Sequence, residues 1–361
     1  MKKILTLFLA LILTGCSAGG FSSSSAEISL PKQSSPEVSE TKIETSDEKE
    51  VEFSAWTVYW DNEDSEKEIE DLKENLDNVI HFAAYFDAEN ELFLPDKTTE
   101  LFAKLKTNHS DLKCKHYISF VNDKINKDGS SSLKDTKLLA ELFKDEKSME
   151  QHAKEVLSIA RRNGYDGVEI DYEAIRKNTA LWNKFVKFIE ILYAYTSQNG
   201  FELRVVLEPS APLGEIKFPE GPEYVMMCYN LYDSGTTPGP KADKQFIKGL
   251  CQKMSAISGK KTFAFSTGGF DWQYEGDCAA LTETAAAELA LKNGKEPSRD
   301  EASGALYFSY YDDDDKLHEV WYADGKTIKT WAECVEQNGG GNISLWRLCG
   351  NNEESLKEIF E

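Results

Sequence analysis

The sequence predicts an α/β protein in which eight parallel strands, separated by helices, close into a (β/α)8 barrel with a small α+β insertion between strands seven and eight. From about residue 51 onward, short apolar runs typical of strands alternate with longer runs typical of helices. No glycine-rich phosphate loop follows the first strand-like run, which disfavours an open doubly wound sheet. The eight predicted strands are residues 53–60, 78–86, 113–121, 166–173, 203–208, 224–231, 261–267 and 342–347.

Helical patterns fill most of the intervals between these strands. A helix between two strands carries the chain back across the sheet, so that the second strand runs parallel to the first. Repetition of this order therefore favours a parallel barrel. The predicted helices are residues 65–76, 98–106, 148–163, 180–198 and 243–257.

The interval between the last two predicted strands is too long for a simple loop. An alanine-rich run predicts a helix over residues 278–292, and runs at 304–311 and 317–323 predict a hairpin around the acidic turn 312–315. A further helix is predicted at 327–337. The aspartates of the turn lack the spacing of an EF-hand calcium loop, so we expect a solvated turn. The inserted lobe is expected at about 273–326 within a domain spanning 51–361.

The fourth predicted strand carries an acidic ladder. It reads Asp-Gly-Val-Glu-Ile-Asp-Tyr-Glu from Asp166 to Glu173, and in a strand its side chains alternate between two faces. The apolar face suits packing beneath helices. The opposite face carries Glu169, Asp171 and Glu173, with neighbours about 6.6 Å apart along the strand.

Such a ladder points to acid catalysis. Buried like charges push at least one carboxyl group towards its protonated form, and glycoside hydrolysis needs a carboxylic acid that keeps its proton near neutral pH. The bland alternative is a solvated acidic edge strand. The Asp-Gly start, the strict alternation and the apolar partner face argue against it.

Composition narrows the function further. The 361 residues carry a net charge of -22, which disfavours nucleic acid or an anionic membrane surface as ligand and fits an enzyme with a neutral substrate. The five histidines show no metal-ligand or catalytic-triad spacing, and the seven cysteines show no C-x-x-C motif. We therefore expect no metal and no cofactor. The cysteine pattern leaves open whether disulfides form.

The N-terminus has the pattern of a targeting segment. Lys2 and Lys3 precede an apolar run at residues 4–13, which is too short to span a bilayer. The following Leu-Thr-Gly-Cys resembles a bacterial lipobox, which implies a signal peptide at 1–15 and a lipid anchor on Cys16. Residues 16–50 contain few large apolar side chains, namely Phe21, Ile28, Leu30 and Ile43, and are predicted to be a disordered tether. We expect a monomer at the cell surface; an ordinary cleaved signal with an incidental Cys16 is the alternative.

Three motifs in the expected order resemble glycoside hydrolase family 18. The acidic strand resembles the family signature D-x-x-D-x-D-x-E, with Glu169 where the family usually has Asp. Residues 227–230 resemble its sixth-strand M-x-Y-D/N element, and Trp346 matches the tryptophan on the floor of the sugar-binding cleft. Residues 318–324 resemble the inserted lobe of bacterial members that include spore-cortex-lytic N-acetylglucosaminidases.

The resemblance implies a division of labour among the acidic residues. Glu173 would protonate the glycosidic oxygen and later activate water, while Asp171 would orient the acetamido group of the substrate. Glu169 would lie deeper and share a proton with Asp171. Tyr229 would donate its hydroxyl to the acetamido carbonyl. Asp166 is expected to fix the strand entry instead of taking part in the chemistry.

The resemblance also implies the remaining substrate contacts. Met227 shares a strand face with Tyr229, Asn230 would complete the polar wall, and Trp346 would stack on the sugar. Trp56 and Trp272, like Trp60, lie near predicted strand ends and would line outer subsites.

The implied function is a retaining glycoside hydrolase that cleaves β-1,4 bonds at N-acetylglucosamine with help from the substrate's own amide. Chitin, peptidoglycan and the chitobiose core of N-glycans all present the required 2-acetamido group, so the substrate stays open. The main alternative is a non-catalytic glycan-binding lipoprotein on the same barrel. A solute-binding lipoprotein of a transporter is a third hypothesis, but it would make the three motifs coincidental.

Overall fold

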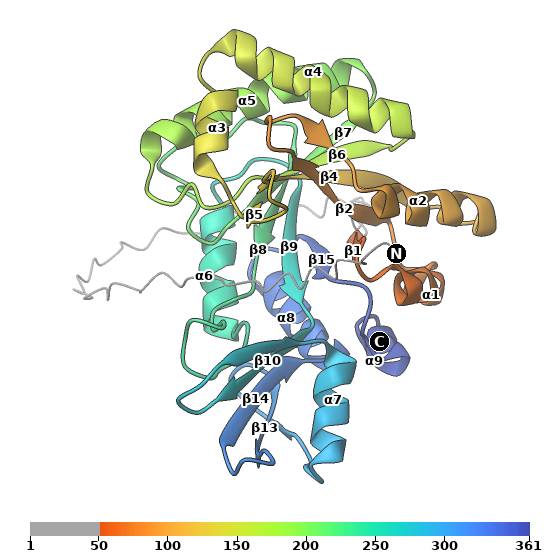
Figure 1. Cartoon of the computed structure of the whole chain (residues 1–361), viewed down its shortest axis with the longest axis vertical. Helices are drawn as coiled ribbons and strands as arrows, with labels where there is room; N and C mark the ends of the chain where they lie inside the picture. Colours follow the sequence, from red (N-terminus) through yellow and green to blue (C-terminus); the bar gives the residue numbers. More distant parts are fainter. Residues whose placement is uncertain (1–50) are drawn as a thin grey trace, which may run out of the picture.

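The computed structural model describes residues 51–361, and the expected signal peptide and tether lie outside the described residues. Eight parallel strands close into a barrel, which confirms the predicted (β/α)8 fold (Figure 1). The strands pair in chain order, and the last pairs back onto the first. They are β1 (Phe53–Val58), β2 (Asn78–Phe86), β4 (Lys115–Ile125), β6 (Gly167–Asp171), β7 (Glu202–Leu207), β8 (Glu223–Met227), β9 (Lys261–Ser266) and β15 (Asn342–Trp346).

Helices cover the outside of this barrel (Figure 1). Helix α4 shows why they form where they do. Asp145 caps its first turn by accepting a hydrogen bond from the Ser148 amide at 2.8 Å, and Gly164 ends it with φ 76°. The helices are α1 (Asn62–Leu72), α2 (Asp96–Asn108), α3 (Thr136–Leu142), α4 (Glu146–Asn163), α5 (Thr179–Gln198), α6 (Lys244–Met254), α8 (Gly325–Gln337) and α9 (Glu353–Glu358).

One barrel crossover has a different form. Residues 208–222 join β7 to β8 without an α-helix. This segment contains Pro209, Pro212, Pro219 and Pro222, which lack the backbone N–H that a helix interior requires.

The two faces of β6 separate as the alternation predicts. Val168 and Ile170 are fully buried in the hydrophobic core that includes residues from the surrounding helices. Glu169 and Asp171 are also buried, on the opposite face, which places them inside the barrel. The strand itself ends at Asp171, so Glu173 lies beyond the ladder and is not part of it.

The insertion between β9 and β15 forms a second sheet at one end of the molecule (Figure 1). The predicted hairpin is present as β13 (Leu306–Tyr311) and β14 (Leu317–Ala323). They join β10 (Gly268–Gln273), β11 (Cys278–Leu281) and β12 (Ser298–Arg299) in a five-stranded sheet, and α7 (Glu283–Lys292) packs against it.

The lobe begins earlier than expected, and its first strand was not predicted. Strand β10 starts directly after β9 with a Gly-Gly pair, which allows the neighbouring strand to approach closely. A Cβ atom on Gly269 would lie 1.7 Å from the carbonyl oxygen of Trp321. Residues 278–281 were predicted to be helical but pair with β10 as β11. The helix starts after Thr282, whose hydroxyl caps the Ala285 amide.

Within residues 51–361 the structure has no disulfide bond and no membrane-spanning helix. All six cysteines among residues 51–361 have free thiols, and burial raises the pKa of Cys114 and Cys251 to about 11. Within the same residues, no helix combines the length and the apolar character needed to span a bilayer.

The buried His152 leads to a prediction about acid stability. Its Nε2 lies 2.7 Å from the Tyr172 hydroxyl, and burial lowers the pKa of His152 to about 3. Since this pKa returns to about 6.5 on unfolding, the unfolded chain binds a proton first as the pH falls. The free energy of unfolding should therefore decline by about 1.4 kcal/mol per pH unit between about pH 6.5 and about pH 3 on account of this residue.

A His152→Gln variant isolates this effect. Between about pH 6.5 and 5, the wild type should lose about 2 kcal/mol more stability than the variant. Urea unfolding at the two pH values measures the difference. Equal losses in both proteins would contradict a histidine that is buried and neutral.

Candidate active site

The predicted catalytic side chains converge at the C-terminal ends of the barrel strands. Asp171 is the last residue of β6, Met227 the last of β8 and Trp346 the last of β15. Burial raises the pKa of Tyr229 well above its ordinary value, and the charges of Asp171 and Glu173 raise it further. The phenol and both carboxyl groups are thus close enough to interact, as the topology of a barrel requires.

Asp171 is buried beside two other acidic groups. Its side chain is 6% exposed, and its Oδ1 atom has no hydrogen-bond partner. Burial raises the pKa of Asp171 well above its ordinary value, and the charges of Glu173 and Glu169 raise it further. A buried oxygen without a hydrogen-bond partner costs free energy. The group is therefore suited to receive a hydrogen-bond donor from a ligand.

Glu173 follows β6 and is held through its backbone. Its N–H donates to Oδ1 of Asn122 at 2.9 Å, and Nδ2 of Asn122 donates to the Glu173 carbonyl oxygen at 3.2 Å. The next residue, Ala174, has φ 62° and donates its N–H to Oε2 of Glu208 at 2.8 Å. Asn122 and Glu208 thereby fix where the acid stands. Neither residue belongs to a motif from which its role could be predicted.

Lys134 forms an ion pair with the Glu173 carboxylate. It lies between β5 (Ser131–Ser132) and α3, 39 positions from Glu173 in the chain. Burial acts to lower the pKa of Lys134, but the charges of Glu173, Asp171 and Glu208 outweigh it and leave the pKa raised. The side chain therefore stays cationic. Because Lys134 lies in an irregular loop, no periodic pattern in the sequence predicts its contact with Glu173.

Glu169 has different partners from those expected. We expected it to share a proton with Asp171, but its two oxygens accept hydrogen bonds from Trp56 Nε1 at 2.7 Å and Arg204 Nε at 3.0 Å. Arg204 also pairs with Glu223 at 2.7 Å inside the barrel. Burial raises the pKa of Glu169, while Arg204 and Trp56 oppose the rise. Glu169 thus belongs to a buried ionic network below the site.

Arg204 was not among the predicted site residues, although the sequence contains a signal for it. It is the one charged residue within the apolar run 203–207 of β7, and it pairs in register with Glu169 on β6. A buried arginine requires acidic partners, so a charged residue in an apolar strand indicates a facing carboxylate.

Two of the predicted sugar-binding tryptophans are buried, which corrects that prediction. Trp56 is 2% exposed, and its indole nitrogen is engaged by Glu169. Trp272 is 6% exposed and donates its indole N–H to the carbonyl oxygen of Asp233 at 3.2 Å. Trp56 supports the barrel interior, and Trp272 links the lobe to the loop after β8. Neither presents a ring face to solvent.

Trp346 has the placement expected of a stacking surface. It is partly buried and meets Trp56 and Phe82 edge to face, with ring centroids 6.0 and 5.0 Å apart. Trp60 is 38% exposed and lies edge to face with Phe82 at 6.1 Å. An aromatic wall therefore runs outward from Trp346, and Trp60 is its exposed end.

The remaining predicted residues lie in the barrel interior, in the turn after β8 or at the start of β6. Met227 and Tyr229 pack in the barrel interior with Trp346, and Asn230 has φ 62° in the turn that follows. Asp166 accepts a hydrogen bond from the His116 amide at 2.8 Å, which ties the starts of β6 and β4 together. This contact agrees with a structural role for Asp166.

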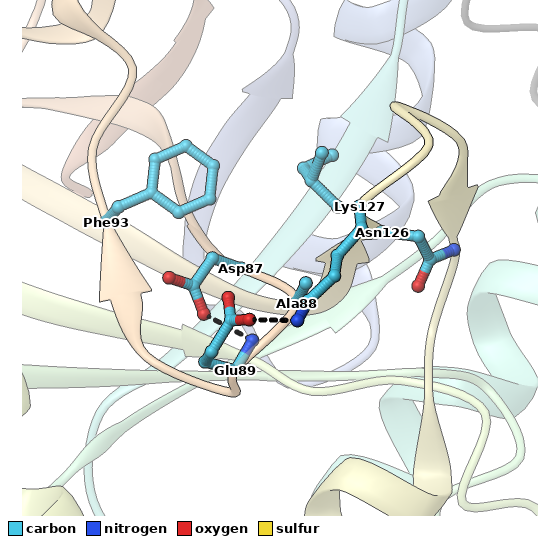
Figure 2. A pocket seen from close by; sticks show the side chains of 7 residues that line it. Asp87, Ala88, Glu89, Phe93, Asn126 and Lys127 are labelled. Atoms are coloured by element: carbon cyan, nitrogen blue, oxygen red, sulfur yellow. Dashed lines mark hydrogen bonds and ion pairs between the residues drawn. The ribbon is translucent and has the colours of Figure 1, made fainter.

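A shallow pocket occupies the rim near the β4–β5 turn and the turn from β2 to β3 (Leu92–Phe93), with a volume of about 380 Å³ (Figure 2). Lys127 crosses it to pair with Glu89 at 2.7 Å. None of the predicted site residues line it. Within residues 51–361 there is also no cluster of His, Cys, Asp and Glu suited to a metal ion. The residues around the pocket are Asp87, Ala88, Glu89, Phe93, Ile125, Asn126 and Lys127.

Known proteins of similar sequence include a glycosylase and cortical fragment-lytic enzymes of Bacillus. The chain is 24% identical over 237 residues to the uncharacterized glycosylase YvbX of Bacillus subtilis, covering 62% of this chain and 68% of the relative. It is 24% identical over 217 residues to the cortical fragment-lytic enzyme of Bacillus cereus, covering 54% of this chain and 48% of that enzyme. The chain thus spans about half the length of this second relative.

Solved structures share the fold. The spore cortex-lytic enzyme SleL of Bacillus cereus superposes with a TM-score of 0.69 at 18% identity, over 86% of this chain and 73% of that one. A chitinase from Chromobacterium violaceum superposes with a TM-score of 0.72 at 18% identity, over 86% of this chain and 98% of that one. The family model of glycosyl hydrolases family 18 matches residues 55–351. The chain belongs to glycosyl hydrolases family 18, and it is a glycoside hydrolase.

Proposed function

We propose that this protein is a retaining hydrolase that cleaves β-1,4 bonds at N-acetylglucosamine by substrate-assisted catalysis. The observation that carries the proposal is Asp171, which is buried between Glu169 and Glu173 with Oδ1 unpartnered. An acetamido N–H is the donor that this oxygen lacks. The carboxyl group beyond it, on Glu173, is partly exposed and free of the buried network.

Each step of the reaction assigns work to one group. Glu173 protonates the glycosidic oxygen, while the acetamido oxygen of the substrate attacks the anomeric carbon. Asp171 accepts a hydrogen bond from the acetamido nitrogen and stabilises the oxazolinium ion that forms. Glu173 then removes a proton from water. The water attacks the anomeric carbon and opens the oxazolinium ring, with net retention of configuration. A nucleophile already attached to the substrate has a high effective molarity.

The reaction outcome provides the test. Proton NMR of the first products should show the β-anomer before mutarotation, and a thiazoline analogue of the oxazolinium ion should inhibit competitively. Release of the α-anomer first would mean inversion and would refute the mechanism. Binding without any turnover of any glycan would favour the alternative of a non-catalytic glycan-binding protein.

Removal of the Tyr229 hydroxyl should slow the chemical step. In the mechanism this hydroxyl donates to the acetamido carbonyl and aligns it for attack, so Tyr229→Phe should lower kcat by about 10²-fold with little change in KM. Steady-state kinetics on a chitooligosaccharide measures this. Tyr274→Phe, at a 69% exposed tyrosine of the lobe, serves as the control and should leave kcat unchanged. A rise in KM alone would assign Tyr229 to ground-state binding.

The relatives narrow the range of substrates. One is named a cortical fragment-lytic enzyme and a similar structure is a chitinase, which supports glycans built on N-acetylglucosamine. Incubation with chitin, peptidoglycan and N-glycans, followed by mass spectrometry of the products, would separate these substrates and distinguish endo from exo cleavage.

We further propose that the mature protein is anchored to the outer face of the bacterial membrane through lipid on Cys16. The proposal is supported by the lipobox-like sequence before Cys16 and by the polar composition of residues 16–50. Metabolic labelling with palmitate should mark the wild type, and Cys16→Ser should abolish the label and release the protein from membranes. A labelled Cys16→Ser protein would refute the anchor.

A further inference from the structure

Two adjacent residues of β4 position both the acid of the site and the ammonium group beside it. The side chain of Asn122 clamps the Glu173 backbone, and its carbonyl oxygen accepts a hydrogen bond from the Asp135 amide at 2.8 Å. Oδ1 of the next residue, Asp123, accepts a hydrogen bond from the Lys134 amide at 2.7 Å. The ion pair between Lys134 and Glu173 therefore joins two residues that are both fixed through their backbones.

The backbone conformation of Lys134 indicates that its place matters. Its φ is 52°, in the left-handed region that is unfavourable for a residue with a side chain. Such a conformation persists where surrounding contacts enforce it, and it is found preferentially at functional sites. The strained residue here is the one whose charge meets the acid. Lys134 lies outside the three motifs that resemble glycoside hydrolase family 18, so none of them assigns it a role.

This ion pair sets the charge of Glu173 before a substrate binds. Burial acts to lower the pKa of Lys134, but the charges of Glu173 and Asp171 outweigh it, so the side chain stays cationic. A neighbouring ammonium group stabilises the carboxylate form of a carboxyl group. Glu173 is therefore negatively charged in the free enzyme. The first catalytic step needs a proton on Glu173, so another group close by must hold that proton.

Asp171 is the group that can hold it. Burial raises the pKa of Asp171 well above its ordinary value, and the charge of Glu173 raises it further, more strongly than the charge of Glu169 does. Oδ1 of Asp171 has no hydrogen-bond partner within residues 51–361. Both oxygens of Glu169 already accept hydrogen bonds, from Trp56 and Arg204. The two carboxyl groups that share one proton are therefore those of Asp171 and Glu173.

We propose that Lys134 is a positioning residue that keeps the single proton of this carboxyl pair on Asp171 in the free enzyme and lets it pass to Glu173 when the substrate binds. The inference rests on the proposed function and concerns how its acid acquires a proton. The acetamido N–H of the substrate donates a hydrogen bond to Oδ1 of Asp171. This bond stabilises the Asp171 carboxylate, which releases its proton to Glu173.

The proton is conserved through both steps of the reaction. Glu173 gives it to the glycosidic oxygen as the bond from that oxygen to the anomeric carbon breaks and the acetamido oxygen bonds to the same carbon. Glu173 is then a carboxylate again, which the Lys134 ammonium stabilises. It next takes a proton from water, whose oxygen bonds to the anomeric carbon as the bond to the acetamido oxygen breaks. When the product leaves, this proton returns to Asp171.

The surroundings of the pair are mainly acidic, so the loss of one cation should have a large effect. Lys134 lowers the pKa of Asp171 against burial and the neighbouring carboxylates, and it forms the ion pair with Glu173. The charged and titratable groups that act on the pair, on each other or on Lys134 come from every adjacent segment. They are Asp123 on β4, Glu169 on β6, Arg176 after β6, Glu208 after β7 and Tyr229 after β8.

Removal of the ammonium group should move the pH profile of the reaction. The profile of kcat/KM on chitotetraose should be bell-shaped, and its two limbs report the titrations of the pair in the free enzyme. Lys134→Met makes both carboxylates less stable, so both limbs should shift upward by about 1–2 pH units. Lys134→Gln should give the same shift, and Lys134→Arg should return both limbs to their wild-type positions. Lys137→Met, at an exposed lysine three residues away, serves as the control and should leave the profile unchanged.

Infrared difference spectra provide a second readout that needs no substrate. Subtraction of the Glu173→Gln spectrum from that of the wild type isolates the Glu173 carboxyl group. Its carboxylate band should appear about 1–2 pH units higher in a titration of Lys134→Met, corrected with Lys134→Met/Glu173→Gln, than in the wild type. Subtraction of the Asp171→Asn spectrum from that of the wild type should show a protonated carboxylic acid under conditions in which Glu173 is already a carboxylate.

The remaining outcomes overturn the inference. A lower kcat with both limbs unmoved would give Lys134 a structural role only, and so would a shift that Lys134→Arg fails to reverse. A carboxylate band from Asp171 and an acid band from Glu173 in the free wild type would place the proton on the wrong residue. Each of these results leaves the proposed function intact. Absence of turnover on every saccharide would instead overturn the proposed function, and with it the proton transfer on substrate binding that the inference adds.

Discussion

Glu173→Gln should lower kcat on a natural glycan by about a thousandfold or more. The variant keeps the shape of the side chain and its backbone hydrogen bonds to Asn122, but it has no proton to give to the glycosidic oxygen. General acid catalysis contributes about 10²- to 10⁴-fold, and a sugar alkoxide is a poor leaving group that depends on it fully.

The dependence on the leaving group distinguishes chemistry from misfolding. Nitrophenolate leaves a nitrophenyl glycoside without much protonation, so its first-turnover release by Glu173→Gln should fall far less than hydrolysis of a chitooligosaccharide, although the later activation of water still needs Glu173. Its thermal unfolding should match that of the wild type. Glu220→Gln changes the same charge at an exposed surface residue and serves as the control. Equal losses on both substrates, or undiminished hydrolysis of the glycan, would remove Glu173 from the role of acid.

The parts of the site that the sequence predicts are those that one strand or one strand end can specify. Glu169 and Asp171 face the barrel interior because their apolar neighbours face the helices. Tyr229 and Trp346 lie at the same end of the barrel as Asp171 because parallel barrel strands all end at the same rim. The alternation of side chains along a strand and the order of strands in a barrel can both be predicted from the sequence, and both predictions hold here.

The contacts that the sequence does not predict all cross between distant segments. Lys134 reaches Glu173 from an irregular loop, and Asn122 clamps the Glu173 backbone from β4. No periodicity connects such positions. The predictions for Trp56 and Trp272 are wrong for a related reason. A position near a strand end does not decide whether an indole points outward. Buried hydrogen-bond acceptors hold both indoles inside the protein.

The inserted lobe shows that contacts between distant segments also limit what the sequence predicts about the fold. Alanine-rich sequence predicts a helix from residue 278, but pairing with β10 takes the first four residues into a strand. Glycine normally signals a break, and at Gly269 it instead permits a backbone approach that any side chain would block. Tertiary pairing overrides the local propensity in both cases.

Arg204→Met should destabilise the protein by about 3–5 kcal/mol, which is the largest stability effect we expect from a single substitution here. Arg204 is 1% exposed and pairs with both Glu169 and Glu223. Methionine fills much of the same volume, but it leaves a buried carboxylate without its counter-charge. Urea unfolding measures the loss, and Arg161→Met, at an exposed arginine of α4, should change stability by no more than about 0.5 kcal/mol.

A double variant identifies which carboxylate is responsible. Glu223 keeps Lys260 at 3.1 Å and the Thr262 hydroxyl when Arg204 is removed, whereas Glu169 loses its ion pair and keeps the neutral indole N–H of Trp56. Glu169 is therefore the group left uncompensated, and Arg204→Met/Glu169→Gln should recover most of the lost stability. If Arg204→Met/Glu223→Gln recovers more, the network is held from the bottom of the barrel instead. Recovery by Glu169→Gln would mean that the ionised form of Glu169, directly beneath Asp171, depends on Arg204.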